Sequence, residues 1–412
     1  MSAAQDTPKV EPGDLAIVLT GGGARAAYQV GMLRCLGRAF PELRFPIITG
    51  VSAGAINATY LAAHAGALGE SAPALSALWA ELQVEDIFRV DVPWLARNLA
   101  RWATHLVSGG DPRAPEVRGL VDSQPLRSTI QRAVATVDGE IIGIARNLER
   151  GVLQALALTT LNYSTGQTIT WTQGGGDLAA WERPRRVSLP TRIGVEHVMA
   201  SSALPLFFPA VRVGESWYGD GGIRLHTPLA PALHLGARRI LAVSPRYQPT
   251  REEAEQRKVR GYPPPAQILN HLLNSIFLDM LDYDSAQMER LNSLLQRLPP
   301  EERDGLQPVE LLVLRPSVDI GRLAREFEPH LPPAFRYLTR SLGTRETTSG
   351  DFLSYLSFDP AYLTKLMEIG EQDADARLPE IRALLELPAV SNEPASIAIS
   401  GLKATPPSPT DN

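Results

Sequence analysis

The sequence predicts a mixed α/β fold with a mostly parallel central sheet. Two short apolar runs, at residues 15–20 (LAIVLT) and 45–49 (FPIIT), each stop at glycine. Each is followed by a helical pattern, at residues 25–38 and from residue 53 to about residue 68. Continuous apolar runs are typical of buried parallel strands, and a strand, a glycine turn and a helix in repeated succession indicate helical crossovers between such strands.

The rest of the chain adds both strands and helices to this start. Alternating polarity around turn residues predicts two β-hairpins, and short apolar runs predict two further strands, the second of which is expected to rejoin the sheet. Helical periodicity dominates the C-terminal part, with a break expected near Asp282. The hairpins are expected at residues 156–173 and 211–218, the strands at 239–244 and 309–314, and the long helical segments at 266–298 and 321–388.

Composition narrows the class of protein. The 412 residues are 44% hydrophobic and 21% charged, with a formal net charge of −5; this is ordinary for a globular protein and gives no sign of a general nucleic-acid binder. Cys35 is the only cysteine, so no intrachain disulfide framework can form. The first residues lack the apolar core of a signal peptide, and no apolar run of 18 residues occurs. We therefore expect a cytoplasmic protein with at most a peripheral membrane contact.

A serine at a predicted strand-to-helix turn is the strongest chemical signal. Ser52 lies in the motif GVSAG, directly after the second predicted strand and at the start of the helix that follows it. This is the setting of a nucleophile elbow, in which a sharp turn lifts the serine hydroxyl out of the sheet edge. The flanking Gly50 and Gly54 let the chain pass closely, and the helix N-terminus favours negative charge nearby. We therefore favour a catalytic serine over a plain tight turn.

Three consecutive glycines follow the first predicted strand. Consecutive glycine amides at a helix start can form a nest that binds a phosphate or an oxyanion. The spacing also fits the G-x-G-x-x-G/A pattern of dinucleotide-binding proteins, but that alternative requires an acidic residue at the end of the second strand, where the chain has Ile48-Thr49-Gly50. We favour an oxyanion hole that serves the serine, and we predict no cofactor. The predicted members of this oxyanion hole are Gly21, Gly22, Gly23, Ala24 and Arg25.

An aspartate before two glycines is the candidate base for the serine. Asp220 precedes Gly221 and Gly222 and follows the second predicted hairpin. Alone this pattern is typical of a simple turn, but a serine nucleophile needs a base. A Ser–acid–His order is formally open, because His226 and His234 follow the aspartate. The α/β-hydrolase elbow, however, needs several strands before its serine, so we interpret the histidines as structural or surface residues.

These segments together resemble the patatin-like phospholipases. The motifs GGGARAAYQVG, GVSAG and DGG occur in that order, and ASSALPLFFPAV at residues 200–211 is also similar to the family. The similarity covers roughly residues 15–235 and implies a three-layer α/β/α sandwich with a mostly parallel sheet. It implies a dyad of Ser52 and Asp220, with oxyanion donors from the glycine-rich loop. The chain has Ala26 where the family usually has another glycine; since alanine is small and suits a helix, we expect a preserved hole.

The resemblance also implies an activity, the hydrolysis of ester bonds in lipids. Phospholipids, lysophospholipids, neutral glycerides and other fatty acyl esters are all open as substrates, and the reaction would need no calcium or other metal. The alternatives from other classes are a non-catalytic lipid-binding or scaffold protein that keeps the fold and a nucleotide-binding α/β protein. The sequence indicates neither a head group nor an oligomeric state.

The chain is expected to comprise a catalytic core with further segments on both sides. The resemblance gives no function for the C-terminal helical region. The expected segments are a flexible N-terminus at residues 1–13, a patatin-like core at 14–245, a helical segment with a strand at 246–320, a helical region at 321–390 and a disordered tail at 391–412.

Residues 92–107 (VPWLARNLARWATHLV) predict an amphipathic helix. Arg97 and Arg101 fall at the flank of its apolar face or beyond it. Such a helix either lies in a membrane surface with basic edges or packs its apolar face on the domain core, and most amphipathic helices do the latter. The apolar face comprises Trp94, Leu95, Leu99, Trp102 and Leu106.

Overall fold

The computed structural model describes residues 13–89, 92–108, 118–255, 261–344 and 350–386. The predicted flexible N-terminus and disordered tail lie outside these ranges, apart from Gly13.

One mixed sheet of ten strands organises the described part of the chain. Five neighbouring strands are parallel, in the order β12-β11-β1-β2-β5, and the remaining five continue from β5 with antiparallel pairs and one parallel pair. The parallel strands are β1 (Leu15–Leu19), β2 (Ile47–Val51), β5 (Ala155–Asn162), β11 (Arg239–Val243) and β12 (Glu310–Leu314). The others are β6 (Thr168–Gly174), β7 (Glu182–Arg183), β8 (Arg186–Pro190), β9 (Val211–Val213) and β10 (Ser216–Asp220), and β3 (Thr136–Val137) pairs with β4 (Glu140–Ile141) in a separate ribbon.

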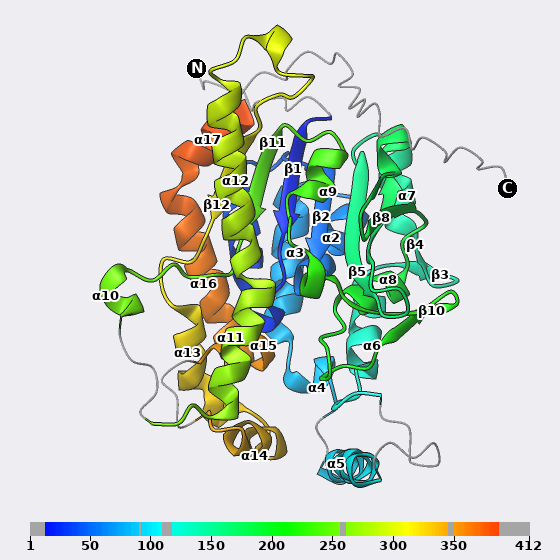
Figure 1. Ribbon diagram of the computed structural model, residues 1–412, viewed down its shortest axis with the longest axis vertical. Coiled ribbons are helices and arrows are strands. Elements are labelled where there is room, and N and C mark those ends of the chain that lie inside the picture. Colours follow the sequence, from blue (N-terminus) through cyan, green and yellow to red (C-terminus); the bar gives the residue numbers. More distant parts are fainter. Residues whose placement is uncertain (1–12, 90–91, 109–117, 256–260, 345–349, 387–412) are drawn as a thin grey trace, which may run out of the picture.

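Helices cover both faces of this sheet (Figure 1). In β1, Leu15 and Ile17 belong to one core cluster and Ala16 and Val18 to another, so successive side chains are buried on opposite faces. The first face packs against α1 (Ala27–Ala39), α2 (Ala53–Ala63), α3 (Leu68–Glu81) and α16 (Pro360–Ala376). The second packs against α9 (Ala230–His234) and α12 (Asp279–Leu295). The predicted three-layer α/β/α architecture is confirmed.

The C-terminal helical region is confirmed, and it packs on the first helix. A Cβ atom at Gly31 of α1 would lie 2.0 Å from the Met367 carbonyl oxygen, and one at Gly370 of α16 would lie 2.1 Å from the Tyr28 carbonyl oxygen. These two glycines therefore let the backbones of α1 and α16 approach closely. The Tyr28 hydroxyl also donates to Asp373 at 3.0 Å, so polar contacts support the same crossing.

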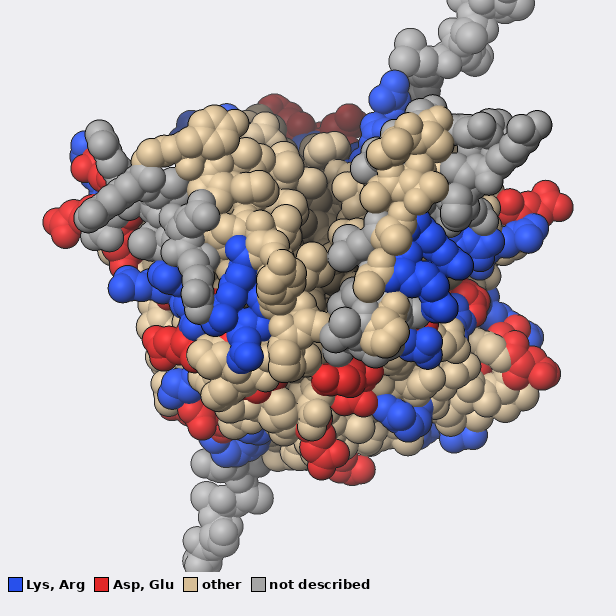
Figure 2. Space-filling model, turned by 90° about the horizontal axis from the view of Figure 1, so that it is seen from below, with Lys and Arg blue, Asp and Glu red and all other residues tan. Residues whose placement is uncertain are grey.

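Several of the remaining helices lie at the carboxyl ends of the parallel strands (Figure 1). Figure 2 views the lower end of the molecule, which is hollowed between uncharged residues and carries Lys and Arg on both sides of the hollow. The remaining helices are α4 (Val84–Ile87), α5 (Val92–Val107), α6 (Gln124–Ala133), α7 (Ile142–Glu149), α8 (Val195–Ser201), α10 (Arg251–Ala254), α11 (Pro265–Phe277), α13 (Ile320–Phe327), α14 (Pro333–Ser341), α15 (Asp351–Leu356) and α17 (Leu378–Glu386).

Two predicted helix boundaries differ from the structure. The helix from residue 53 ends at Ala63, because the backbone at His64 is extended, with φ −70° and ψ 134°. The break in the long helical segment falls at Leu278, between α11 and α12, rather than near Asp282. In both places the amino-acid pattern continues across the boundary, so periodicity alone does not reveal it.

Candidate active site

Ser52 lies at a strained turn between β2 and α2. Its backbone has φ 57° and ψ −133°, values that cost a non-glycine residue about 1–3 kcal/mol. The turn is held from both sides: the Ser52 amide donates to Ser201 Oγ at 3.1 Å, and its carbonyl accepts from Ser202 Oγ at 3.1 Å. A Cβ atom at Gly54 would lie 2.2 Å from the Leu19 carbonyl oxygen, so only glycine fits there. A strained serine at a strand-to-helix turn is the arrangement that a nucleophile elbow requires.

The register of β5 brings the aspartate to this serine. Val51, the last residue of β2, pairs with Thr159 of β5, and Asp220, the last residue of β10, pairs with the adjacent Thr160. Because β6 occupies the other edge of β5, β2 and β10 share one edge and meet end to end. Ser201 Oγ donates to the Thr159 carbonyl at 2.8 Å and so ties the elbow to the same strand.

Asp220 is a buried carboxylate with one oxygen available. Its side chain is 0% exposed, and Oδ1 accepts from the Gly222 amide at 2.9 Å. Within the described ranges, no donor reaches Oδ2 with hydrogen-bond geometry. Burial raises the pKa of Asp220 to about 7. The Ser52 side chain and the Gly222 amide lower this pKa, but by less than burial raises it. A carboxylate with such a pKa is suited to accept a proton near neutral pH.

The glycine-rich loop lies beside the serine. A Cβ atom at Gly21 would come within 2.8 Å of Ser52 Cβ, and Gly22 and Gly23 line the same cavity as Ser52. The amide of Arg25 donates to the Gly22 carbonyl at 3.2 Å, so it is engaged within the turn itself. The structure thus brings the first three predicted oxyanion residues to the serine, while the Arg25 amide has another partner.

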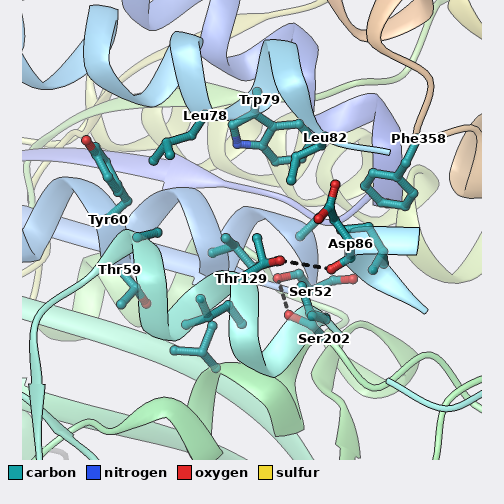
Figure 3. Close-up of a pocket in the computed structure, with 18 of the residues that line it drawn as sticks. Ser52, Thr59, Tyr60, Leu78, Trp79, Leu82, Asp86, Thr129, Ser202 and Phe358 are labelled. Atoms are coloured by element: carbon teal, nitrogen blue, oxygen red, sulfur yellow. Dashed lines mark hydrogen bonds between the residues drawn. The ribbon is translucent and has the colours of Figure 1, made fainter. Parts of the chain in front are cut away.

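An apolar cavity of about 260 Å³ opens from Ser52. It follows α2 past Thr59 and Tyr60, below Leu78 and Trp79 of α3 (Figure 3). Thr129 of α6 donates to the Asp86 carbonyl at 3.0 Å across one side of the cavity. The apolar part of the wall comprises Ala53, Ile56, Leu75, Leu82, Ile87, Leu126, Ile130, Ala133, Val134, Val198, Leu204, Phe208, Phe277, Leu356 and Phe358. Such a wall suits a hydrocarbon chain.

No histidine is among the residues that line this cavity in the part of the chain that the structure describes. The side chain of His226 is exposed, and His234 stacks on Trp181 with ring centroids 4.3 Å apart. Burial, together with nearby arginines, lowers the pKa of His234 to about 4. Across the same described ranges, no group of three or more His, Cys, Asp or Glu side chains is placed to hold a metal ion.

The sequence analysis did not predict several residues that belong to the candidate site. Ser201 and Ser202 support the elbow, and their signal was a pair of small polar residues in the segment that resembled the family. Phe277 of α11 and Tyr355 of α15 line the cavity from beyond the predicted core. No local pattern marks these two aromatic residues, because only the tertiary fold brings them to the site.

The comparisons with known proteins agree with this architecture. The patatin-like phospholipase model matches residues 17–233, which is more than half of the chain, so the chain belongs to the patatin-like phospholipase family. This membership supports a lipid hydrolase activity. A search of curated proteins gave no match.

A search of solved structures found proteins with low sequence identity to this chain, among them VipD, a cytosolic phospholipase A2 and ExoU. VipD from Legionella pneumophila is 14% identical, with a TM-score of 0.37 over 90% of this chain and 68% of its own. Human GIVD cytosolic phospholipase A2 is 14% identical, with a TM-score of 0.40 over 91% and 60%, respectively. ExoU, a type III effector of Pseudomonas aeruginosa, is 16% identical, with a TM-score of 0.34 over 92% and 54%. This chain therefore spans less than two thirds of the length of the last two proteins.

Proposed function

We propose that this protein is a serine acyl hydrolase that cleaves fatty acyl esters of lipids with a Ser52–Asp220 dyad. The observation that carries the proposal is the end-to-end meeting of β2 and β10 on one edge of β5. The first of these strands leads into a strained serine that lines an apolar cavity, and the second ends in a buried carboxylate. Family membership supports the same class of reaction.

The reaction proceeds in two acyl-transfer steps. Asp220 accepts the proton of the Ser52 hydroxyl as Oγ attacks the ester carbonyl, and the amides of Gly22 and Gly23 stabilise the oxyanion that forms. Asp220 then gives the proton to the departing alcohol, which leaves an acyl-serine. In the second step Asp220 takes a proton from water, the hydroxide attacks the acyl-serine, and the fatty acid leaves as Ser52 regains its proton. No metal takes part.

A p-nitrophenyl ester assay with the purified protein tests this proposal. Turnover, together with covalent labelling by a fluorophosphonate, is expected for an acyl hydrolase. A lipid-binding or scaffold protein with the same fold would bind fatty acyl probes in the cavity but would release no p-nitrophenol. A nucleotide-binding protein would do neither. Absence of both turnover and labelling would contradict the proposal.

The pH dependence of the reaction is expected to follow the ionisation of Asp220. Only the carboxylate form can accept the serine proton, and the pKa of Asp220 is raised to about 7 by burial. The value of kcat/KM should therefore rise with pH, approach a plateau above pH 7, and lie about a hundredfold below the plateau two pH units under the pKa. A pH-stat assay of a soluble ester from pH 5 to 9 measures this. A flat profile down to pH 5 would contradict the assignment of the base.

We also propose a peripheral contact between the lower end of the molecule and a lipid surface. Within the described residues, no helix is long and apolar enough to cross a membrane. Arg97 and Arg101 of α5 are exposed, but of the apolar side chains predicted on that helix the structure describes only that of Trp102. Leu206 is an exposed apolar residue close to the cavity. It is 73% exposed and its φ is 64°, and the nearby Leu204 and Phe208 line the cavity.

The positive φ of Leu206 costs backbone energy, and it leaves a large apolar side chain in water beside the cavity residues Leu204 and Phe208, where a lipid surface would cover it. Insertion of leucine into lipid contributes about 1.5–3 kcal/mol, so Leu206→Asp should weaken binding to anionic vesicles by about tenfold or more. Turnover of a soluble short-chain ester should not change. Val137 on β3 is also exposed, at 55%, and Val137→Asp is the matched control in vesicle sedimentation. Equal vesicle binding by Leu206→Asp and Val137→Asp would contradict the role of Leu206.

A further inference from the structure

The side chain of Arg25 connects the glycine-rich loop to the C-terminal region. It is 2% exposed; Nε donates to Ser354 Oγ at 2.6 Å, and Nη2 donates to Asp351 Oδ1 at 2.6 Å. The guanidinium carbon also lies 4.8 Å from the centre of the Tyr355 ring. These three partners all belong to α15, which lies beyond the segment that matches the family.

The same short helix touches the loop directly at Gly23. A Cβ atom at this glycine would lie 2.1 Å from the Tyr355 carbonyl oxygen, and its φ is 57°. Any other residue at this position would collide with the backbone of α15 and strain its own backbone. The loop that carries the proposed oxyanion donors therefore packs directly against the backbone of α15.

Asp351 is itself held in place by other elements. Its Oδ2 accepts from Asn274 Nδ2 of α11 at 2.9 Å. A Cβ atom at Gly321 of α13 would lie 2.3 Å from Asp351 Oδ1 and 2.7 Å from an Arg25 nitrogen, so α13 packs closely against the ion pair. The Asp351 carboxylate is thus held in place by α11 and α13, and the Arg25 guanidinium is bound to it.

A glycine-rich loop has few side chains with which to fix its own position. Arg25 is the long side chain nearest to Gly22 and Gly23 in the loop, and its buried charge requires a partner because an unpaired buried charge is costly. We propose that Asp351 is a positioning residue, which acts through Arg25 to hold the amides of Gly22 and Gly23 where the oxyanion forms. This inference rests on the proposed acyl-transfer function.

Asp351→Asn should lower kcat with little change in KM. The oxyanion exists only in the transition state and the intermediates, so a displaced hole weakens transition-state stabilisation and leaves binding of the ester almost unchanged. Loss of one oxyanion donor costs about 10²–10³ in kcat, and we expect a smaller loss of about 10- to 100-fold for a residue that acts through another. Steady-state kinetics with a soluble p-nitrophenyl ester measures both constants.

A second buried ion pair gives the matched control. Asp14 and Arg239 lie at the opposite end of β1, with side chains 10% and 4% exposed and Nη2 to Oδ1 at 2.5 Å. Asp14→Asn should lower the melting temperature as Asp351→Asn does, because each variant leaves a buried guanidinium without its carboxylate. It should keep the wild-type kcat. An equal kcat for Asp351→Asn and Asp14→Asn would overturn the positioning role.

Ser354→Ala decides the question if Asp351→Asn does not fold. It removes the acceptor of Arg25 Nε, together with the hydrogen bond from Ser354 Oγ to the Asp351 carbonyl, and keeps the carboxylate, so we expect a folded protein with a several-fold lower kcat. A folded Ser354→Ala with wild-type kcat would then overturn the proposal. If the wild-type protein itself hydrolyses no ester, the proposed function fails; normal wild-type turnover with unchanged variants refutes only the role of Asp351.

Discussion

Ser52→Ala is expected to abolish ester hydrolysis, with a loss in turnover on the order of a million-fold. The proposed mechanism forms a covalent bond to Ser52 Oγ, and no other group in the described cavity replaces that oxygen at the strained turn. Labelling by a fluorophosphonate should disappear as well. Because alanine suffers the same backbone strain as serine at φ 57°, the melting temperature should change little. Intact-mass spectrometry of the labelled protein measures the outcome.

Ser293→Ala is the control for this experiment. Ser293 lies on the exposed side of α12, away from the cavity-lining residues, so its variant should keep full labelling and turnover. Full labelling of Ser52→Ala would refute Ser52 as the nucleophile and would leave the lipid-binding alternative in place.

Asp220→Asn should reduce turnover by about 10²–10⁴-fold, the usual contribution of a general base. The amide keeps the size of the carboxyl group and an oxygen for the Gly222 amide, but it cannot take the serine proton. His226→Ala and His234→Ala, tested separately with the same ester, should keep most of the activity, since neither histidine lines the cavity. A folded histidine variant as inactive as Ser52→Ala would replace the dyad with a triad.

The same aspartate variant carries an expectation for stability. The folded-state pKa of Asp220 is raised from 3.8 to about 7, so the native state holds the proton more tightly than the unfolded chain does. The contribution of Asp220 to the free energy of unfolding is therefore most favourable below its unfolded pKa and is lost as pH rises through 7. Asp220→Asn should melt at a higher temperature than the wild type at pH 8, and the difference should shrink at pH 4.

Local patterns in the sequence predicted the fold class well. The apolar run before Gly21 and the one before Gly50 became the neighbouring parallel strands β1 and β2, and each is followed by the expected helix after its glycine turn. Both signals are local, because burial on two faces makes a strand continuously apolar and a glycine lies near its end, although β2 continues through Gly50 to Val51. The ends of α2 and α11 were not predictable in this way, since tertiary contacts decide where a helical pattern stops.

The sequence predicted the individual residues of the candidate site but not how the fold brings them together. Ser52 and Asp220 each stand in a recognisable motif, but their meeting depends on the pairing of β2 and β10 with one edge of β5, which no local pattern encodes. The contact between Arg25 and Asp351 spans 326 residues and was equally hidden. Long-range pairing between strands and helices is the information that periodicity lacks.

The position of β1 within the sheet limits how the chain can be shortened. The segment that matches the family ends at residue 233, whereas β11, which pairs with the whole of β1, begins at Arg239. A fragment cut at residue 233 would turn β1, five fully buried apolar residues, into an open sheet edge with unpaired amides and carbonyls. Such edges pair with other chains and cause aggregation. We therefore expect the segment defined by similarity to aggregate when expressed alone, and a fragment that extends at least through β11 to keep β1 paired on both sides.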